Sequence, residues 1–157
     1  AVVIGIDGYE TSALRGCVSD AKMVVEYLTS NLHVPGNHIQ LLLRISKPTC
    51  ANIIKAILGL STNTDIQHGD NILIYFAGHG TTYECADYPQ YEKETAAALG
   101  TIEALCPIDR RFKPTATGIP DISDREINTI LAEIAKKKGN HTTFILDCCH
   151  SFSITRG

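Results

Sequence analysis

Four short apolar runs, separated by segments with helical periodicity, constrain the fold of this chain more than any other feature. The runs cover residues 1–7, 39–43, 71–77 and 141–148. They are continuous rather than alternating, which predicts strands buried on both faces. Apolar residues recur at helical spacing between successive runs, over residues 18–32, 50–60 and 122–138. We therefore expect an α/β domain with a mostly parallel sheet and helices on both of its faces.

Several short signals locate the helix ends. Ser19 or a neighbour is the expected cap of the first helix, and Thr49 that of the second. Ser123 with Glu126 three residues later forms a capping box at the start of the third helix. Residues 81–104 show no clean period, so we expect an irregular insertion there.

Length and charge exclude several classes of protein. A chain of 157 residues fits one domain, and 44% apolar residues exclude a disordered chain. Lys and Arg are scattered and the formal net charge is −3, so no nucleic-acid partner is expected. No apolar run approaches the roughly 20 residues of a membrane span, so no membrane partner is expected either. The sequence does not begin with Met, which indicates a piece of a longer protein.

The chain contains six cysteines, an even number that would allow disulfides. A domain of this size can form its core without them, and no C-x-x-C pair indicates a zinc or redox site. We therefore expect free thiols and a reducing, cytoplasmic environment. The cysteines are Cys17, Cys50, Cys85, Cys106, Cys148 and Cys149.

Polar residues follow three of the four predicted strands. Asp7-Gly8 follows the first, Gly78-His79-Gly80 the third, and residues 147–151 end the fourth. Because ligands on parallel sheets bind beyond the carboxyl ends of the strands, we expect these segments to meet at one edge of the sheet.

His79 and Cys149 would form a nucleophile and base pair at that edge. An imidazole takes the thiol proton, and the thiolate attacks a carbonyl carbon. The alternatives are a turn histidine without chemistry and a cysteine that acts as a small buried apolar residue. Cys148 and Cys149 are adjacent and point in opposite directions if the chain is extended, so only one of them can face His79.

Four segments, in the same order along the chain, resemble motifs of the metacaspases, a family of caspase-like cysteine peptidases. The signature Q-A-C-x-G of animal caspases is absent. The four segments are Leu14–Asp20, Tyr75–Gly80, Cys106–Asp109 and Leu146–Ser151.

The resemblance implies roles for six residues. It makes Cys149 the nucleophile, His79 the general base and Gly80 a donor to the oxyanion. It also implies a pocket for a basic side chain, lined by Cys17, Asp20 and Asp147.

Structural alternatives stay open for three of these residues. Gly80 could be an ordinary turn glycine, and Asp20 an acid that stabilises the first turn of a helix. Asp147 could be satisfied by backbone N–H groups nearby.

The sequence departs from the metacaspase pattern at three positions. Ala77 stands where the family often has Ser, and Phe152 where it usually has Gly. Residues 122–125 match a calcium-binding I-x-D-D segment, but Arg125 replaces the second acid. Since a hard cation needs several oxygen ligands, we expect no cofactor, with a calcium ion as the open alternative.

Together these observations predict that residues 1–157 form the large-subunit part of a caspase-like peptidase domain, with the small-subunit segment absent from this chain. The expected activity is endopeptidase cleavage of polypeptides after Arg or Lys, with self-cleavage after Arg156 or a basic residue shortly downstream. The expected partners are such polypeptides and the small-subunit segment of the same protein. A non-catalytic caspase-like scaffold or assembly module is the alternative, and a peptidase of legumain or separase type is another.

Overall fold

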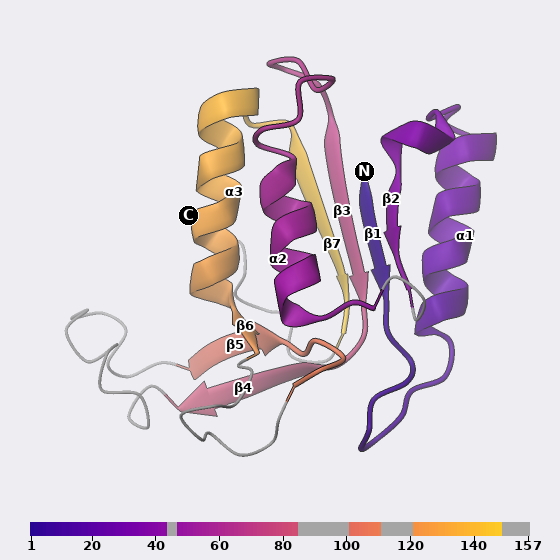
Figure 1. Ribbon diagram of the computed structural model, residues 1–157, viewed down its shortest axis with the longest axis vertical. Helices are drawn as coiled ribbons and strands as arrows, with labels where there is room; N and C mark the ends of the chain where they lie inside the picture. The colour runs from indigo at the N-terminus through magenta and orange to yellow at the C-terminus, as the bar shows by residue number, and fades with distance from the viewer. Residues whose placement is uncertain (44–46, 85–100, 111–120, 149–157) are drawn as a thin grey trace.

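The computed structural model describes residues 1–43, 47–84, 101–110 and 121–148. Four parallel strands form the central sheet, in the order β2-β1-β3-β7 (Figure 1). This arrangement confirms the predicted α/β class. The four strands are β1 (Val2–Gly5), β2 (Gln40–Leu42), β3 (Ile72–Ala77) and β7 (Thr142–Asp147).

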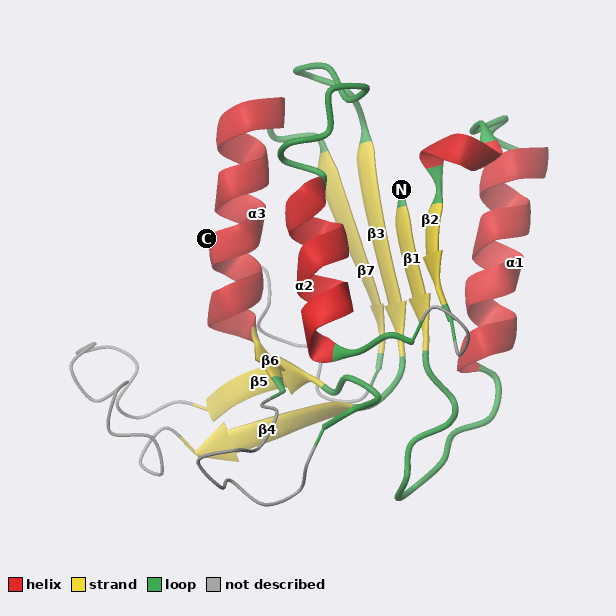
Figure 2. Cartoon of the chain, in the orientation of Figure 1, coloured by secondary structure: helices red, strands yellow, loops and turns green. Residues whose placement is uncertain are grey.

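Helices cover both faces of this sheet, as predicted (Figure 2). Helix α1 (Cys17–Ser30) packs on one face, in a cluster that includes Val3 and Tyr75. Helices α2 (Cys50–Gly59) and α3 (Asp124–Lys138) pack on the other face, in the larger cluster around Ile4 and Phe76. Alternate residues of β1 and β3 thus serve opposite layers of the core, which explains their continuous apolar runs. The expectation of burial on both faces is wrong for β7, where half-buried and exposed residues alternate.

Close contact between α1 and β1 requires a glycine. A Cβ atom at Gly5 would lie 2.6 Å from the carbonyl oxygen of Cys17 and 2.7 Å from the Cβ of Ala21. The first turn of α1 therefore sits directly over the end of β1, which fixes the loop between them near the carboxyl edge of the sheet.

The cap of α1 differs from the prediction. The helix begins at Cys17 with Gly16 as its N-cap, so Ser19 lies inside the helix. The carboxylate of Asp7 accepts the Val18 N–H at 3.4 Å and takes the place of a local side-chain cap. The other two caps are as predicted. Thr49 accepts the Asn52 N–H at the start of α2, and the capping box of α3 is complete.

A second, antiparallel sheet lies beyond the carboxyl ends of the parallel strands (Figures 1 and 2). The expectation of an irregular insertion over residues 81–104 is wrong at both ends of that range, because β4 and β5 form there. These strands pair across a long sequence separation, with Thr81 opposite Ala104. The local sequence pattern therefore does not predict them. The strands are β4 (Gly80–Glu84), β5 (Thr101–Leu105) and β6 (Ile122–Ser123).

No helix in the described part of the chain is both long enough and apolar enough to span a membrane.

A short 3-10 helix, η1 (Gly36–His38), precedes β2.

Candidate functional site

The carboxyl ends of β1, β3 and β7 meet at one edge of the sheet. Ala77 of β3 lies in register with Gly5 of β1 and with Asp147 of β7. Because β3 ends at Ala77 and β4 begins at Gly80, His79 lies in the short connection between the two sheets. Asp7-Gly8, Gly78-His79-Gly80 and Asp147 are therefore brought together at this edge, whereas residues 149–151 lie outside the described residues.

The ring of His79 is held by the loop between β1 and α1. Its Nε2 atom lies 2.6 Å from the carbonyl oxygen of Ser12, a residue with a positive φ of 58°. Since a carbonyl oxygen only accepts, this contact assigns the proton to Nε2. In the neutral ring Nδ1 is then left as the nitrogen that can accept a proton.

The backbone of His79 is held as well. Its N–H donates to the phenolic oxygen of Tyr9 at 2.9 Å, and its carbonyl oxygen accepts the Cys106 N–H at 3.0 Å. His79 is half-buried, so its ring is both anchored and reachable from solvent.

Carboxylates gather around Cys17 at the start of α1. Burial, together with the negative charges of Asp7, Asp147 and Asp20, raises the pKa of the Cys17 thiol from 9.0 to about 11. The carboxylates of Asp20 and Asp147 thus lie close enough to act on the charge of Cys17. The pocket role that the resemblance implies for these three residues stays a prediction. Asp7 was predicted to lie at this edge, but its place beside Cys17 was not.

Tyr75 forms part of the same cluster, and sequence reasoning gave it no role. Its hydroxyl donates to Oδ2 of Asp147 at 3.0 Å. Burial and this carboxylate raise its pKa, so the hydroxyl stays protonated and remains a donor. The available signal was the period of two along β3, which puts Tyr75 on the same face as Ala77, the register partner of Asp147.

The two adjacent cysteines differ in what the structure describes. Cys148 packs against the core cluster formed with α2 and α3, on the sheet face opposite Tyr75. Cys149 lies outside the described residues, as do Phe152 and Arg156. Gly80 opens β4 in register with Leu105.

Two other segments compared with the metacaspase pattern, Cys106–Asp109 and 122–125, have structural roles in the described chain. Oδ1 of Asp109 accepts the Cys50 N–H at 2.9 Å and so binds the first turn of α2. Asp124 begins α3, and its Oδ1 accepts the Arg125 N–H at 2.9 Å.

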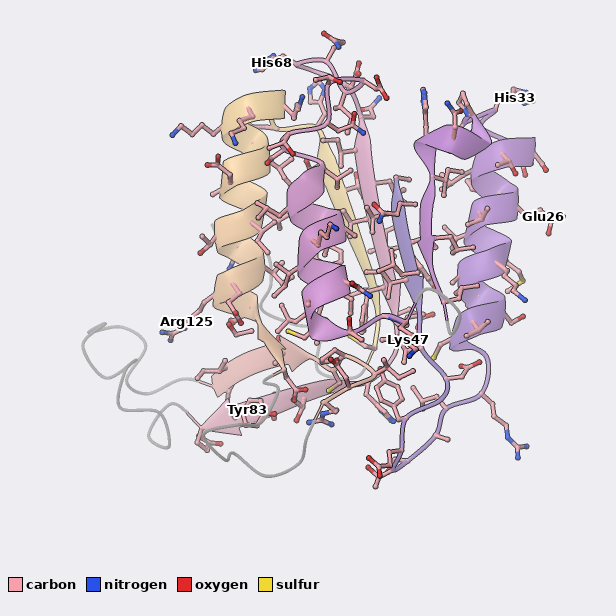
Figure 3. All side chains as sticks on the ribbon, in the orientation of Figure 1. Glu26, His33, Lys47, His68, Tyr83 and Arg125 are labelled. Carbon is pink, nitrogen blue, oxygen red and sulfur yellow. The ribbon has the colours of Figure 1, made fainter. Side chains whose placement is uncertain are left out.

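Oxygen atoms of the 122–125 segment are engaged in hydrogen bonds within the chain. Ser123 and Glu126 bond to each other in the capping box, and Arg125 follows Asp124 directly in the sequence. Figure 3 shows the side chain of Arg125 at the surface of the molecule. Burial raises the pKa of Asp124 above its ordinary value. Within the described ranges, no group of three His, Cys, Asp or Glu residues could hold a metal ion.

Residues 1–156 match the family profile described as "Metacaspase, peptidase C14 domain". This chain belongs to the metacaspase family. The match covers almost the whole chain and confirms the resemblance seen in the four segments. Metacaspases are a family of cysteine peptidases.

Curated metacaspases match at similar levels. Metacaspase III c of Phaeodactylum tricornutum is 31% identical over 162 residues, which cover 98% of this chain and 43% of the relative. Metacaspase-1A of Aspergillus terreus is 30% identical over 159 residues, covering 98% and 36%. Metacaspase-1A of Aspergillus niger is also 30% identical, with 35% of its length covered. The chain thus spans about two fifths of the length of these metacaspases.

Proposed function

We propose that this chain is the large-subunit part of a cysteine endopeptidase that cleaves polypeptides after Arg or Lys. The observation that carries the specificity is the cluster of Asp7, Asp20 and Asp147 around Cys17. The cluster lies at the same sheet edge as His79. Three carboxylates around a partly buried site attract a guanidinium or an ammonium group and repel an acidic side chain. Arg is preferred to Lys, because its planar fork can engage two carboxylates at once.

The proposed reaction uses Cys149 and His79. The imidazole of His79 accepts the Cys149 thiol proton at Nδ1, and the thiolate adds to the scissile carbonyl carbon. The oxygen of the tetrahedral intermediate gains negative charge, which the backbone N–H of Gly80 stabilises. His79 then gives its proton to the leaving amine, and a thioester remains on Cys149. Water hydrolyses the thioester after giving a proton to His79, which restores the thiol.

Two observations support these assignments. The hydrogen bond from Nε2 of His79 to Ser12 leaves Nδ1 as the basic nitrogen. Cys148 packs against the core on the α2 and α3 side, away from the face that holds Tyr75 and Cys17, which argues against Cys148 as the nucleophile.

A small-subunit segment of the same protein is the proposed partner of β7. Among the described strands, β7 pairs only with β3. Ile145 on β7 is 42% exposed, although it is apolar and lies beside Tyr75 in register. An unpaired strand edge with an exposed apolar side chain is suited to accept a further strand.

We also propose that the protein resides in the reducing environment of the cytoplasm. The free thiols of Cys17 and Cys50 support it.

The specificity can be tested on the full-length protein with peptides that differ only in the residue before the scissile bond. We expect cleavage fastest after Arg, slower after Lys and none after Asp. Asp20→Asn and Asp147→Asn should each lower kcat/KM for the arginyl peptide about tenfold or more, since roughly 1.4 kcal/mol is a factor of ten. Asp65→Asn is the matched control, because Asp65 is exposed in the loop before β3, at the opposite end of the sheet.

Three outcomes would contradict the proposal. A preference for cleavage after Asp would contradict the proposed pocket for a basic side chain. Unchanged arginyl cleavage in both variants would contradict it as well. Failure of the intact protein to cleave any of the peptides or to react with an arginyl chloromethyl ketone would favour the non-catalytic scaffold.

Self-processing after Arg156, or after a basic residue shortly downstream, is part of the proposal. Intact-mass analysis should find fragments in the wild-type protein and none in the Cys149→Ala variant. Equal fragmentation of both would point to another protease.

A further inference from the structure

Tyr9 connects three segments that meet at His79. It lies in the loop between β1 and α1 and is 6% exposed. Its hydroxyl donates to the carbonyl oxygen of Cys106 at 2.9 Å and accepts the His79 N–H at 2.9 Å. The Cys106 N–H donates in turn to the His79 carbonyl oxygen at 3.0 Å. The backbone donor and acceptor of His79 thus belong to one closed ring of hydrogen bonds that passes through Tyr9.

The aromatic ring of Tyr9 also contacts the imidazole. The two ring centroids lie 4.6 Å apart with an interplanar angle of 50°. Ser12, three residues further along the same loop, holds Nε2. One loop therefore fixes the backbone of His79, one face of its ring and one of its two nitrogens.

Gly78 shows how tightly the Tyr9 hydroxyl is enclosed. A Cβ atom at position 78 would lie 2.6 Å from the phenolic oxygen and 3.0 Å from Cζ of Phe76. The glycine before His79 is thus required by the close approach of Tyr9. Burial raises the pKa of Tyr9, which keeps the hydroxyl protonated and able to donate and accept at once.

We propose that Tyr9 is a positioning residue for catalysis, which holds His79 where its ring can take and return the proton of the nucleophile. The inference rests on the proposed function, in which His79 is the general base. A general base must lie within hydrogen-bond reach of the proton it takes, and a displacement of about 1 Å can cost a hundredfold in rate. The hydroxyl bonds to His79 and Cys106 and not to the carboxylates around Cys17, so it serves turnover rather than substrate affinity.

Tyr9→Phe removes both hydrogen bonds and keeps the aromatic ring. In the full-length protein we expect kcat for an arginyl peptide to fall about ten- to a hundredfold, with KM changed less than about twofold. The rate at which iodoacetamide alkylates Cys149, mapped by mass spectrometry from about pH 5 to about pH 9, should fall in parallel, because thiolate formation needs a well-placed imidazole. This second assay does not depend on the substrate preference.

Tyr83→Phe is the matched control. It also removes the hydroxyl of a tyrosine in a hydrogen-bond network, because Tyr83 on β4 bonds to Asp121 and Arg110. We expect a similar loss of thermal stability in both variants and a normal kcat only in Tyr83→Phe. An equal loss of kcat in the two variants, or a Tyr9→Phe loss carried by KM alone, would overturn the inference.

Two further variants keep the outcomes distinct. If His79→Ala retains turnover and Cys149 alkylation, the proposed dyad is wrong. If His79→Ala is inactive and Tyr9→Phe has wild-type kcat, the dyad stands and the role of Tyr9 is wrong. Should Tyr9→Phe not fold, Gly78→Ala displaces the hydroxyl while Tyr9 stays in the chain, and a normal kcat in that variant would equally refute the role.

Discussion

The phenolic oxygen of Tyr75 lies 3.0 Å from Oδ2 of Asp147, across the boundary between β3 and β7. The two residues are not register partners, because Tyr75 pairs with Ile145 and Asp147 with Ala77. The tyrosine side chain therefore reaches two residues along the sheet, toward the edge that carries His79. Ala77 has no polar side-chain atom, and the hydroxyl of Tyr75 supplies a donor on the same face.

This contact predicts that Tyr75→Phe weakens the binding of basic side chains. A hydrogen bond to a carboxylate contributes roughly 1.5–3 kcal/mol, and part of that orients Asp147 toward substrate. We expect KM for an arginyl peptide to rise about three- to tenfold, with kcat changed less than about twofold. Tyr27→Phe is the control, since Tyr27 is 54% exposed on α1. An unchanged KM in Tyr75→Phe would show that Asp147 needs no such support.

Separate alanine substitutions of the two adjacent cysteines should distinguish their roles. Cys149→Ala is expected to abolish peptide cleavage. Cys148→Ala should keep most of the activity and lose some thermal stability, because Cys148 packs against the core. Steady-state kinetics and thermal unfolding of both variants test this. An inactive Cys148→Ala protein beside an active Cys149→Ala protein would reverse the assignment.

Activity should depend only weakly on calcium. Arg125 places a cation beside Asp124, and the oxygens of Ser123 and Glu126 are bonded to each other. We expect the rate of arginyl cleavage after chelator treatment to change less than about twofold when calcium is added. Arg125→Asp restores a second acid, so that variant should gain a larger calcium response. A strict calcium requirement in the wild-type protein would contradict the expectation.

Alkaline pH should destabilise the fold. Burial raises the pKa of the Cys17 and Cys50 thiols from 9.0 to about 11, so the folded chain holds both protons longer than the unfolded chain does. The free energy of unfolding should therefore be unaffected by these groups below about pH 9 and fall as pH rises from 9 to 11.

Denaturant unfolding across this pH range is the test. The Cys17→Ser, Cys50→Ser double variant should show a flatter dependence than the wild-type protein. Burial also raises the pKa of Tyr9 and Tyr83, so the decline should continue above about pH 10 in both proteins. A stability that stays level or rises from pH 9 to 11 would contradict the account.

The sequence by itself determined the layers of this protein. Continuous apolar runs predicted strands covered on both faces, which holds for β1 and β3, and the capping residues Thr49 and Ser123 indicated where α2 and α3 begin. Because parallel strands share an edge, the sequence also predicted that Asp7, His79 and Asp147 meet there.

Only the tertiary structure decided how the site is supported. Tyr9 bonds to His79 and Cys106, which are 70 and 97 residues away, and no local pattern encodes such contacts. β4 and β5 were missed for the same reason, since each strand is specified by its distant partner. Asp7 caps α1 in place of the expected Ser19 because the close packing of α1 on Gly5 brings its carboxylate to the first turn. Local periodicity records which side chains are buried, whereas a site assembled from separate loops depends on distances that exist only after the sheet has formed.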